Sequence, residues 1–241
     1  MMKTLVAITA TLAILAFAPL ATGTRSEVGA AVLGVGAHGR SGATGQSGPT
    51  GTTRPAGPVP SCPTSPCAVV SETTAMQVKV GTLYSPLTIP RDGTIVGWTI
   101  ILSRPTASQI AFFDTHEGGR PEAGLAILKH TTGLGYELAA RSPFVQLQSY
   151  LGEKTQFALS TTIPVQRGER IALTVPTWAP ALAIELGPHT LWRASRPRST
   201  CTSAAEASTQ TAQTTIGSLV QYSCLYQTAQ VLFSATLIST P

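Results

Sequence analysis

From about residue 72 onward, apolar and polar residues alternate one by one in short segments that Gly, Pro and Asp residues separate. Met76, Val78 and Val80 alternate with Gln77 and Lys79 in this way. A period of two places every second side chain on one face of a β-strand, whereas an amphipathic helix needs a period of about 3.6. The alternation therefore limits most of this part of the chain to strands with one apolar face.

About ten such segments follow one another, with turn-forming residues between them. The clearest lie at 76–80, 96–102, 157–159, 171–175 and 231–237, and weaker ones lie near 109–114, 124–130, 136–140, 144–148, 181–186 and 189–194. In the segment at 96–102 we expect Val96, Trp98, Ile100 and Leu102 to face the core. Only Ser203–Gln213 has a pattern that could form a short helix. The pattern predicts an all-β fold, an antiparallel β-sandwich or jelly roll.

A short motif occurs twice in this part of the chain. Thr88-Ile89-Pro90 leads through Gly93 to a following strand, and Thr162-Ile163-Pro164 leads through Gly168 to another. Each copy has the order strand, tight turn, strand. We expect two equivalent hairpins in the two halves of a sandwich.

The N-terminus has the three parts of a secretory signal. Met1–Lys3 is short and positive, Leu5–Leu20 is apolar, and Ala21-Thr22-Gly23 is a small-x-small site for signal peptidase. We predict a signal peptide over 1–23 and a secreted or cell-surface protein. The alternative is a membrane anchor, for which the apolar run is a little short. Charged residues or Pro interrupt every later apolar run, so we expect no transmembrane span after processing.

Residues 24–71 have the composition of a flexible low-complexity linker. Nine Gly and four Pro occur among the thirty-two positions 29–60. Glycine recurs at every third position from Gly36 to Gly51, the period that a collagen-like triple helix requires. Because the series is short and Arg54 breaks it, we favour a disordered linker before a domain at 72–241. A monomer and a triple-helical homotrimer both remain open.

Four cysteines fit an oxidising compartment outside the cell. Cys62 and Cys67 are separated by four residues, and Cys201 and Cys224 by twenty-two. Four cysteines allow three pairings, and pairing Cys62 with Cys67 and Cys201 with Cys224 is the simplest because each bridge closes a local loop. A zinc site is disfavoured, since the spacings do not fit a zinc ligand set.

The charge of the chain argues against a nucleic-acid partner. Only 11% of residues are charged and the formal net charge is +5. Residues 71–241 hold twelve basic and ten acidic side chains. Nucleic-acid binding needs a dense stripe of Lys and Arg, which these sparse charges do not supply.

The best polar cluster for chemistry is Asp114, His116 and Glu117, followed by Gly118-Gly119. These side chains are metal ligands, and a Gly-rich loop could fold them around an ion. The favoured alternative is a solvated hairpin loop, where polar residues are common. The sequence contains no G-x-S-x-G elbow and suggests no particular pair of carboxylates, so we favour a protein without catalytic activity and expect no cofactor.

Aromatic rings offer a second kind of site, because their flat faces cover the apolar faces of sugars. Trp98 lies in register with an apolar strand face and is expected in the core. Trp178, between two prolines, and Trp192, beside Arg193, are the candidates for a ligand platform. The favoured alternative for both is packing at the rim of the sandwich.

The run VPTWAPAL at Val175–Leu182 and the tripeptide Cys224-Leu225-Tyr226 resemble exported β-rich proteins of high-GC Gram-positive bacteria. The resemblance covers roughly residues 72–240. It implies an exported β-rich domain and brings no activity with it, since no function is assigned to that group.

Two functions therefore stand as hypotheses. The first is a non-catalytic exported module for adhesion or for contact with cell-envelope glycans, or a purely structural surface protein. It predicts an exposed Trp178 or Trp192 and no buried ionisable cluster. The second is a metal-dependent hydrolase, and it predicts that Asp114, His116 and Glu117 converge in a pocket.

Overall fold

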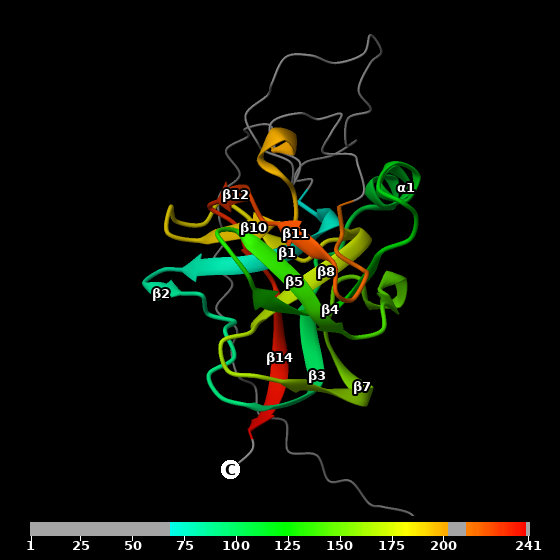
Figure 1. Ribbon diagram of the computed structural model, residues 1–241. Helices are drawn as coiled ribbons and strands as arrows, with labels where there is room; N and C mark the ends of the chain where they lie inside the picture. The colour runs from blue at the N-terminus through cyan, green and yellow to red at the C-terminus, as the bar shows by residue number, and fades with distance from the viewer. Residues whose placement is uncertain (1–67, 202–210, 240–241) are drawn as a thin grey trace, which may run out of the picture. The chain divides into compact units, whose positions relative to one another are not determined.

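Most of the strands join one large antiparallel sheet. The computed structural model describes residues 68–201 and 211–239, and Figure 1 shows their arrangement. In spatial order the large sheet consists of β11 (Leu219–Gln221), β5 (Gly135–Arg141), β4 (Glu122–His130), β8 (Arg170–Ala179), β1 (Val70–Val80), β10 (Leu191–Ala194) and β12 (Cys224–Gln227), with β2 (Leu83–Tyr84) beside β1 and β6 (Val145–Gln146) beside β4. β1 is an inner strand of this sheet and pairs with β8 on one side and β10 on the other.

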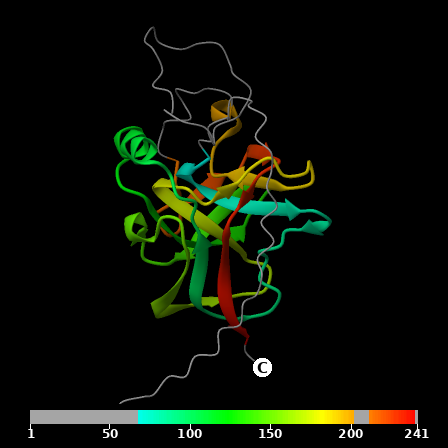
Figure 2. The ribbon, with the colours of Figure 1, turned by 180° about the vertical axis from the view of Figure 1, so that it is seen from behind.

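A second sheet of three strands packs against the large one. Its spatial order is β14 (Phe233–Ser239), β3 (Gly93–Ile101) and β7 (Lys154–Val165), and Figure 2 shows β14 beside β3 from behind. A two-stranded pair, β13 (Gln230–Val231) and β9 (Leu182–Ala183), adds apolar residues to the same core. Antiparallel sheets that curl into a half-barrel confirm the predicted all-β sandwich.

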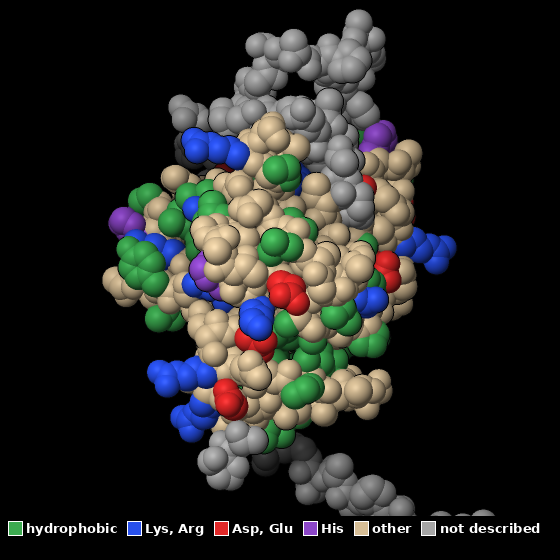
Figure 3. Space-filling model, in the orientation of Figure 1, with side chains coloured by type: hydrophobic (Ala, Val, Ile, Leu, Met, Phe, Trp, Pro, Cys, Tyr) green, Lys and Arg blue, Asp and Glu red, His purple; other side chains and the backbone are tan. Residues whose placement is uncertain are grey.

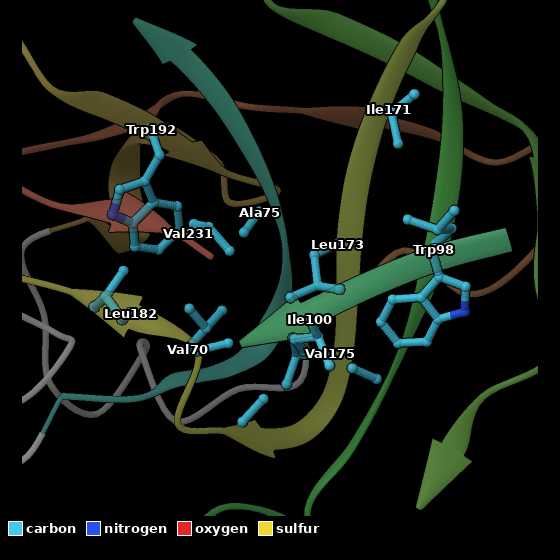
Figure 4. Packing of buried hydrophobic residues seen from close by; sticks show 14 of the residues in the cluster. Val70, Ala75, Trp98, Ile100, Ile171, Leu173, Val175, Leu182, Trp192 and Val231 are labelled. Atoms are coloured by element: carbon cyan, nitrogen blue, oxygen red, sulfur yellow. The ribbon is translucent and has the colours of Figure 1, made fainter. Parts of the chain in front are cut away.

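The main hydrophobic core lies between the two sheets. Ile171, Leu173 and Val175 point into it from alternate positions of β8, as their period of two predicts. Trp98 and Ile100 enter it from β3, and Figure 4 shows these side chains together. Burial of a side chain of this size stabilises a fold by about 1.5–3 kcal/mol. The core is therefore a major source of the stability of the sandwich.

The opposite face of the large sheet is also largely buried, because residues on either side of the edge strand β11 pack over it. We call residues 211–223, which include β11, the covering segment. The apolar cluster on this face consists of Met76, Ala126, Leu128, Tyr136, Leu138, Ala172 and Tyr222. Hydrogen bonds fix the covering segment: the Tyr222 hydroxyl donates to Gln213 Oε1 (2.8 Å), and the Gln213 N–H donates to Thr74 Oγ1 (2.9 Å). Thr74 Oγ1 also lies 3.0 Å from Thr174 Oγ1, with which it shares a hydrogen bond. A connected polar network thus holds the segment to β1 and β8.

Strand β3 departs from the predicted pattern at one position. The alternation predicts Val96 in the core, and this is wrong: Ile95 is fully buried, whereas Val96 is partly exposed. The pairing of β3 with β7 changes register between Ile95 and Gly97. Such an irregularity turns the side chains on one side of it to the other face of the strand.

The weak strand predicted near 109–114 is wrong, because these residues lie in helix α1 (Ala107–His116). Thr106 Oγ1 accepts a hydrogen bond from the Gln109 N–H, and Gln109 Oε1 accepts one from the Thr106 N–H. This capping box satisfies two backbone donors at the helix start. Phe113 then buries itself against the sheet, so tertiary packing supports the helix. Two short 3₁₀ turns complete the helical elements described, at Gln148–Tyr150 and Arg198–Thr200.

The two copies of the Thr-Ile-Pro motif are corners and not hairpins. The Ile89 N–H donates to the Glu169 carbonyl (2.8 Å), and the Ile171 N–H donates to the Leu87 carbonyl (2.9 Å). The copies therefore lie antiparallel beside each other. After each copy the chain continues in the other sheet, so the predicted hairpins are wrong.

Several predictions fall outside the described residues. These are the signal peptide over 1–23, the linker up to residue 67 with its Gly-x-y tract, and the pair Cys62 and Cys67. Most of the short helix predicted over Ser203–Gln213 also lies outside them, while its last residues, 211–213, are not helical. β1 begins at Val70, close to the predicted start of the domain.

Substitution Tyr222→Phe tests the network on the outer face of the sheet. It removes the hydroxyl that donates to Gln213 Oε1 while leaving the ring in place. Loss of one partner of a buried hydrogen bond costs about 1–3 kcal/mol, so we expect a lower midpoint in urea unfolding of the oxidised chain. Tyr84→Phe is the matched control, because Tyr84 is exposed. Equal midpoints for the two variants would contradict the role of the network.

Candidate functional site

Trp178 is fully buried, so the proposal of an exposed ligand platform at this position is wrong, and the ring packs inside the fold. Its ring lies against Phe113 of α1, with ring centroids 5.0 Å apart. Its Nε1–H donates to the Gly119 carbonyl (2.9 Å) and to Asp114 Oδ1 (3.1 Å). Trp178 therefore attaches α1 and the turn after it to the sheet.

Trp192 and Arg193 are also used inside the fold. Trp192 is 2% exposed and stacks on Tyr226, with centroids 4.4 Å apart, and Figure 4 shows it in the core. Arg193 lies on the opposite face, where its guanidinium donates to the carbonyls of Tyr222 (3.1 Å) and Ser223 (3.2 Å). Burial lowers the pKa of Arg193. Neither side chain is arranged as an open ligand platform.

Asp114, His116 and Glu117 do not converge. Asp114 accepts the hydrogen bond from Trp178. His116 is exposed and stacks on Phe112, with its Nδ1 2.7 Å from the Phe112 carbonyl oxygen. Among residues 68–201 and 211–239 no group of three or more His, Cys, Asp or Glu side chains could hold a metal ion. The hypothetical metal-dependent hydrolase thus loses the site predicted for it.

A carboxylate that the sequence analysis did not single out, Glu72, lies near Glu117. Glu72 is in β1, where the pairing with β8 changes register between Ser71 and Thr73, and its φ of 47° is left-handed. A non-Gly residue in this region is strained. The carboxyl group of Glu72 packs against the backbone of Gly118. If Gly118 had a Cβ atom, that atom would lie only 3.3 Å from Glu72 Oε1.

Arg196 supplies a positive charge to this cluster, and it is only 3% exposed. Its Nη2 donates to the Ser71 carbonyl (3.2 Å) and its Nε to Thr211 Oγ1 (3.2 Å). Burial raises the pKa of Glu72, repulsion by Glu117 raises it further, and Arg196 opposes both effects. Burial likewise raises the pKa of Glu117, against a hydrogen bond with Ser71 and the charge of Arg196. The charge of one guanidinium thus acts on two carboxyl groups, and the pKa of each carboxyl group is nevertheless raised. The first hypothesis predicted no buried ionisable cluster, and this part of it is wrong, because Glu72 and Arg196 are buried here.

The disulfide between Cys201 and Cys224 is formed, with Cα atoms 5.2 Å apart. This confirms one half of the predicted local pairing. It joins the end of a 3₁₀ turn to the start of β12, next to the covering segment.

A hairpin at the end of β1 presents the most exposed of the large apolar side chains. β1 turns through Gly81-Thr82 into β2, and Gly81 takes a left-handed φ of 61°, which such tight turns require. Tyr84 is 70% exposed and Leu83 is 59% exposed. Lys79, directly opposite Tyr84, places its Nζ 4.5 Å from the centre of the ring. This cation–π contact favours the observed position of the ring by about 0.5–1 kcal/mol.

Arg170 of β8 extends this surface. Its Nη1 donates to Ser85 Oγ (2.6 Å), and its guanidinium lies 5.8 Å from the centre of the Tyr136 ring. Ser85 has a left-handed φ of 49°, so the chain is strained directly after the exposed ring. We call the surface formed by Lys79, Leu83, Tyr84, Ser85 and Arg170 the hairpin face. In Figure 3 apolar and basic side chains gather where this hairpin projects.

A groove of about 350 Å³ lies beside the start of α1. Val69, Phe113 and Leu182 are among its apolar lining residues, and Arg104 and Gln109 are among its polar ones. Gln109 is already used in the capping box, and Arg104 packs tightly against Gly152. The groove's main polar groups therefore support the loop before α1, and the hairpin face is the more open candidate.

The sequence alone did not predict the hairpin face or the role of Glu72, although each has a recognisable pattern in the sequence. Gly81-Thr82 between Lys79-Val80 and Leu83-Tyr84 is a two-residue hairpin turn inside an alternating pattern. Glu72 is a single acid in a segment of otherwise uncharged residues. Neither signal states which side chain is exposed or which is buried.

The two tryptophans give a test of the site geometry. Trp178→Phe removes an N–H that has two acceptors, whereas Trp192→Phe removes an N–H without a partner among the described residues. Since both variants lose the same volume, we expect Trp178→Phe to lower the free energy of unfolding by about 1–3 kcal/mol more than Trp192→Phe does. Chemical denaturation of both oxidised chains measures this difference. A larger cost at Trp192 would contradict the assignment of partners.

The described part of the chain contains no helix with the length and hydropathy of a membrane span. Comparison with family models, with curated proteins and with solved structures finds no match to this chain. Function must therefore be inferred from the chemistry of the hairpin face and of the carboxylate cluster.

Proposed function

We propose that this protein is a non-catalytic exported β-sandwich that contacts glycans of the cell envelope through its hairpin face. The observation that carries the proposal is the Tyr84 ring, which is 70% exposed and has Lys79 Nζ 4.5 Å from its centre. An exposed aromatic ring held in one orientation loses little entropy when it binds, so it is suited to recognition.

The chemistry of the hairpin face indicates an anionic glycan. The flat ring of Tyr84 and the side chain of Leu83 can cover the apolar face of a sugar ring, while Lys79 and Arg170 carry positive charges beside them. The hydrogen bond to Ser85 positions the guanidinium of Arg170 beside the hairpin, and a guanidinium is a group that binds carboxylate and phosphate.

Export is part of the same proposal. The Cys201–Cys224 disulfide is of the kind that persists in oxidising compartments outside the cytosol, in agreement with the predicted signal peptide. If the Gly-x-y tract forms a triple helix, three hairpin faces would act together and raise the avidity for a repeating polymer. Light scattering of the full chain would distinguish this homotrimer from a monomer.

Retention on solid glycans tests the proposal. The oxidised full chain is incubated with insoluble polysaccharides and with bacterial cell walls, and the bound fraction is measured. We expect Tyr84→Ala and Lys79→Ala to weaken retention on the matrix that binds by about three- to tenfold, the effect of losing about 1 kcal/mol of contact energy. Matched controls are Ile216→Ala, an equally exposed apolar residue, and Lys154→Ala, an exposed lysine.

The outcomes separate the parts of the proposal. If no matrix retains the wild-type chain, glycan contact is wrong. If a matrix retains it and the hairpin variants bind as well as the controls, the hairpin face is wrong while glycan contact stands. High salt should weaken retention if the glycan is anionic.

A further inference from the structure

Glu72 carries an ionisable group where a charge is costly. Its side chain is 8% exposed, and Oε2 has no hydrogen-bond partner in the part of the chain that the structure describes. Its other oxygen lies against the backbone of Gly118, next to Glu117. A buried carboxylate with an unpartnered oxygen is unfavourable as an ion and much less so as a neutral acid. Oε2 is itself buried, with almost no area exposed to solvent.

The backbone of the same residue holds Thr211. The Glu72 carbonyl accepts the Thr211 N–H (2.9 Å) and the Thr211 hydroxyl (2.8 Å). Arg196 Nε donates to that hydroxyl oxygen (3.2 Å), and Ser195 Oγ donates to the Thr211 carbonyl (2.7 Å). The covering segment thus begins at a residue attached directly to the carboxylate cluster.

Charged groups from three parts of the fold face one another here. Glu72 of β1 is faced by Glu117, which caps α1, and by Arg196, which follows β10. Glu117 is faced in addition by His116. With both acids ionised, two negative charges compete for the buried guanidinium of Arg196. With Glu72 protonated, one carboxylate faces Arg196 and the repulsion is gone.

We propose that Glu72 and Glu117 form a proton-binding site that controls how firmly Thr211 and the covering segment are held to β1. Ionised Glu72 can reach water only if its strained bulge opens, and its carbonyl then leaves Thr211. Protonation keeps the bulge closed and Thr211 attached. The site thus converts a change in pH into a change of local stability.

The direction of the effect follows from the raised pKa values. Because burial raises the pKa of both acids above the values of an unfolded chain, the folded form binds protons more tightly. The stabilisation is present below the ordinary carboxyl pKa and is lost as the pH rises through the raised values. Acidification therefore tightens the Thr211 attachment.

Hydrogen exchange at single amides tests this proposal on the oxidised full chain. We compare the protection factor of the Thr211 amide, corrected for the intrinsic exchange rate, at about pH 5 and about pH 7.5. We expect it to be at least about twofold higher at the lower pH, because the closed form binds the proton more tightly than the opened form does. The amide of Leu173 in β8 serves as the reference for global opening.

Variants identify the groups that bind the proton. Glu72→Gln should abolish the pH dependence at Thr211, and Glu117→Gln should reduce it. Glu153→Gln, at an exposed position, should leave it as in the wild type. If Glu72→Gln does not fold, the Glu117→Gln comparison decides, because Glu117 is only partly buried.

Three results would overturn the proposal. They are a Thr211 protection factor equal at both pH values, a pH dependence that survives in the variants of the pair, and an equal change at Leu173, which would mean global opening. None of these results bears on glycan contact by the hairpin face.

Discussion

The buried hydrogen bonds among Thr74, Thr174 and Gln213 are the constraint on which the rest of the structure depends. They lie where β1 and β8 pair, on the face of the large sheet turned away from the small sheet. Hydroxyl groups on a buried face require partners, and an apolar cover would leave them unsatisfied. The covering segment provides those partners and also brings Tyr222 onto the apolar cluster. An antiparallel sheet that could leave one face to solvent is thereby buried on both.

Strand β1 connects this network to both candidate sites. Its middle pairs regularly with β8, while its register shifts near Glu72 at one end, and its pairing with β10 shifts between Gln77 and Lys79 at the other. Bulges free the residues beside them from the regular ladder and re-aim their side chains. The regularly paired middle of β1 therefore connects two irregular ends. One end has a buried acid, and the other pairs with β2, which carries an exposed aromatic ring. This is the arrangement in which a stable scaffold carries sites at its edges.

The sequence predicted the strands well because a period of two depends only on neighbouring residues. The prediction failed where the pairing with another strand determines which side chain is buried. The register of β3 against β7 changes after Ile95, so Ile95 lies in the core in place of Val96. The helix was missed although the motif Thr106-Ala107-Ser108-Gln109 contains a capping box. For the site, the prolines on either side of Trp178 made it a candidate ligand platform, but only the packing of α1 determines that its ring is buried. The burial of Glu72 has the same origin, since α1 and the chain after β10 are distant in sequence.

The disulfide limits how far the covering segment can move. Cys201 and Cys224 stand on either side of it, and Cys224 is itself paired in β12 with Ala194 of β10. A closed loop has less entropy to gain on opening than a free chain end, so release of Thr211 leaves the segment close to the sheet. The Tyr222 end stays near its partners for the same reason, because it is two residues from Cys224. Loosening at Thr211 is therefore local and reversible in the oxidised protein, and the proton-binding site can adjust the cover of the sheet without unfolding the sandwich.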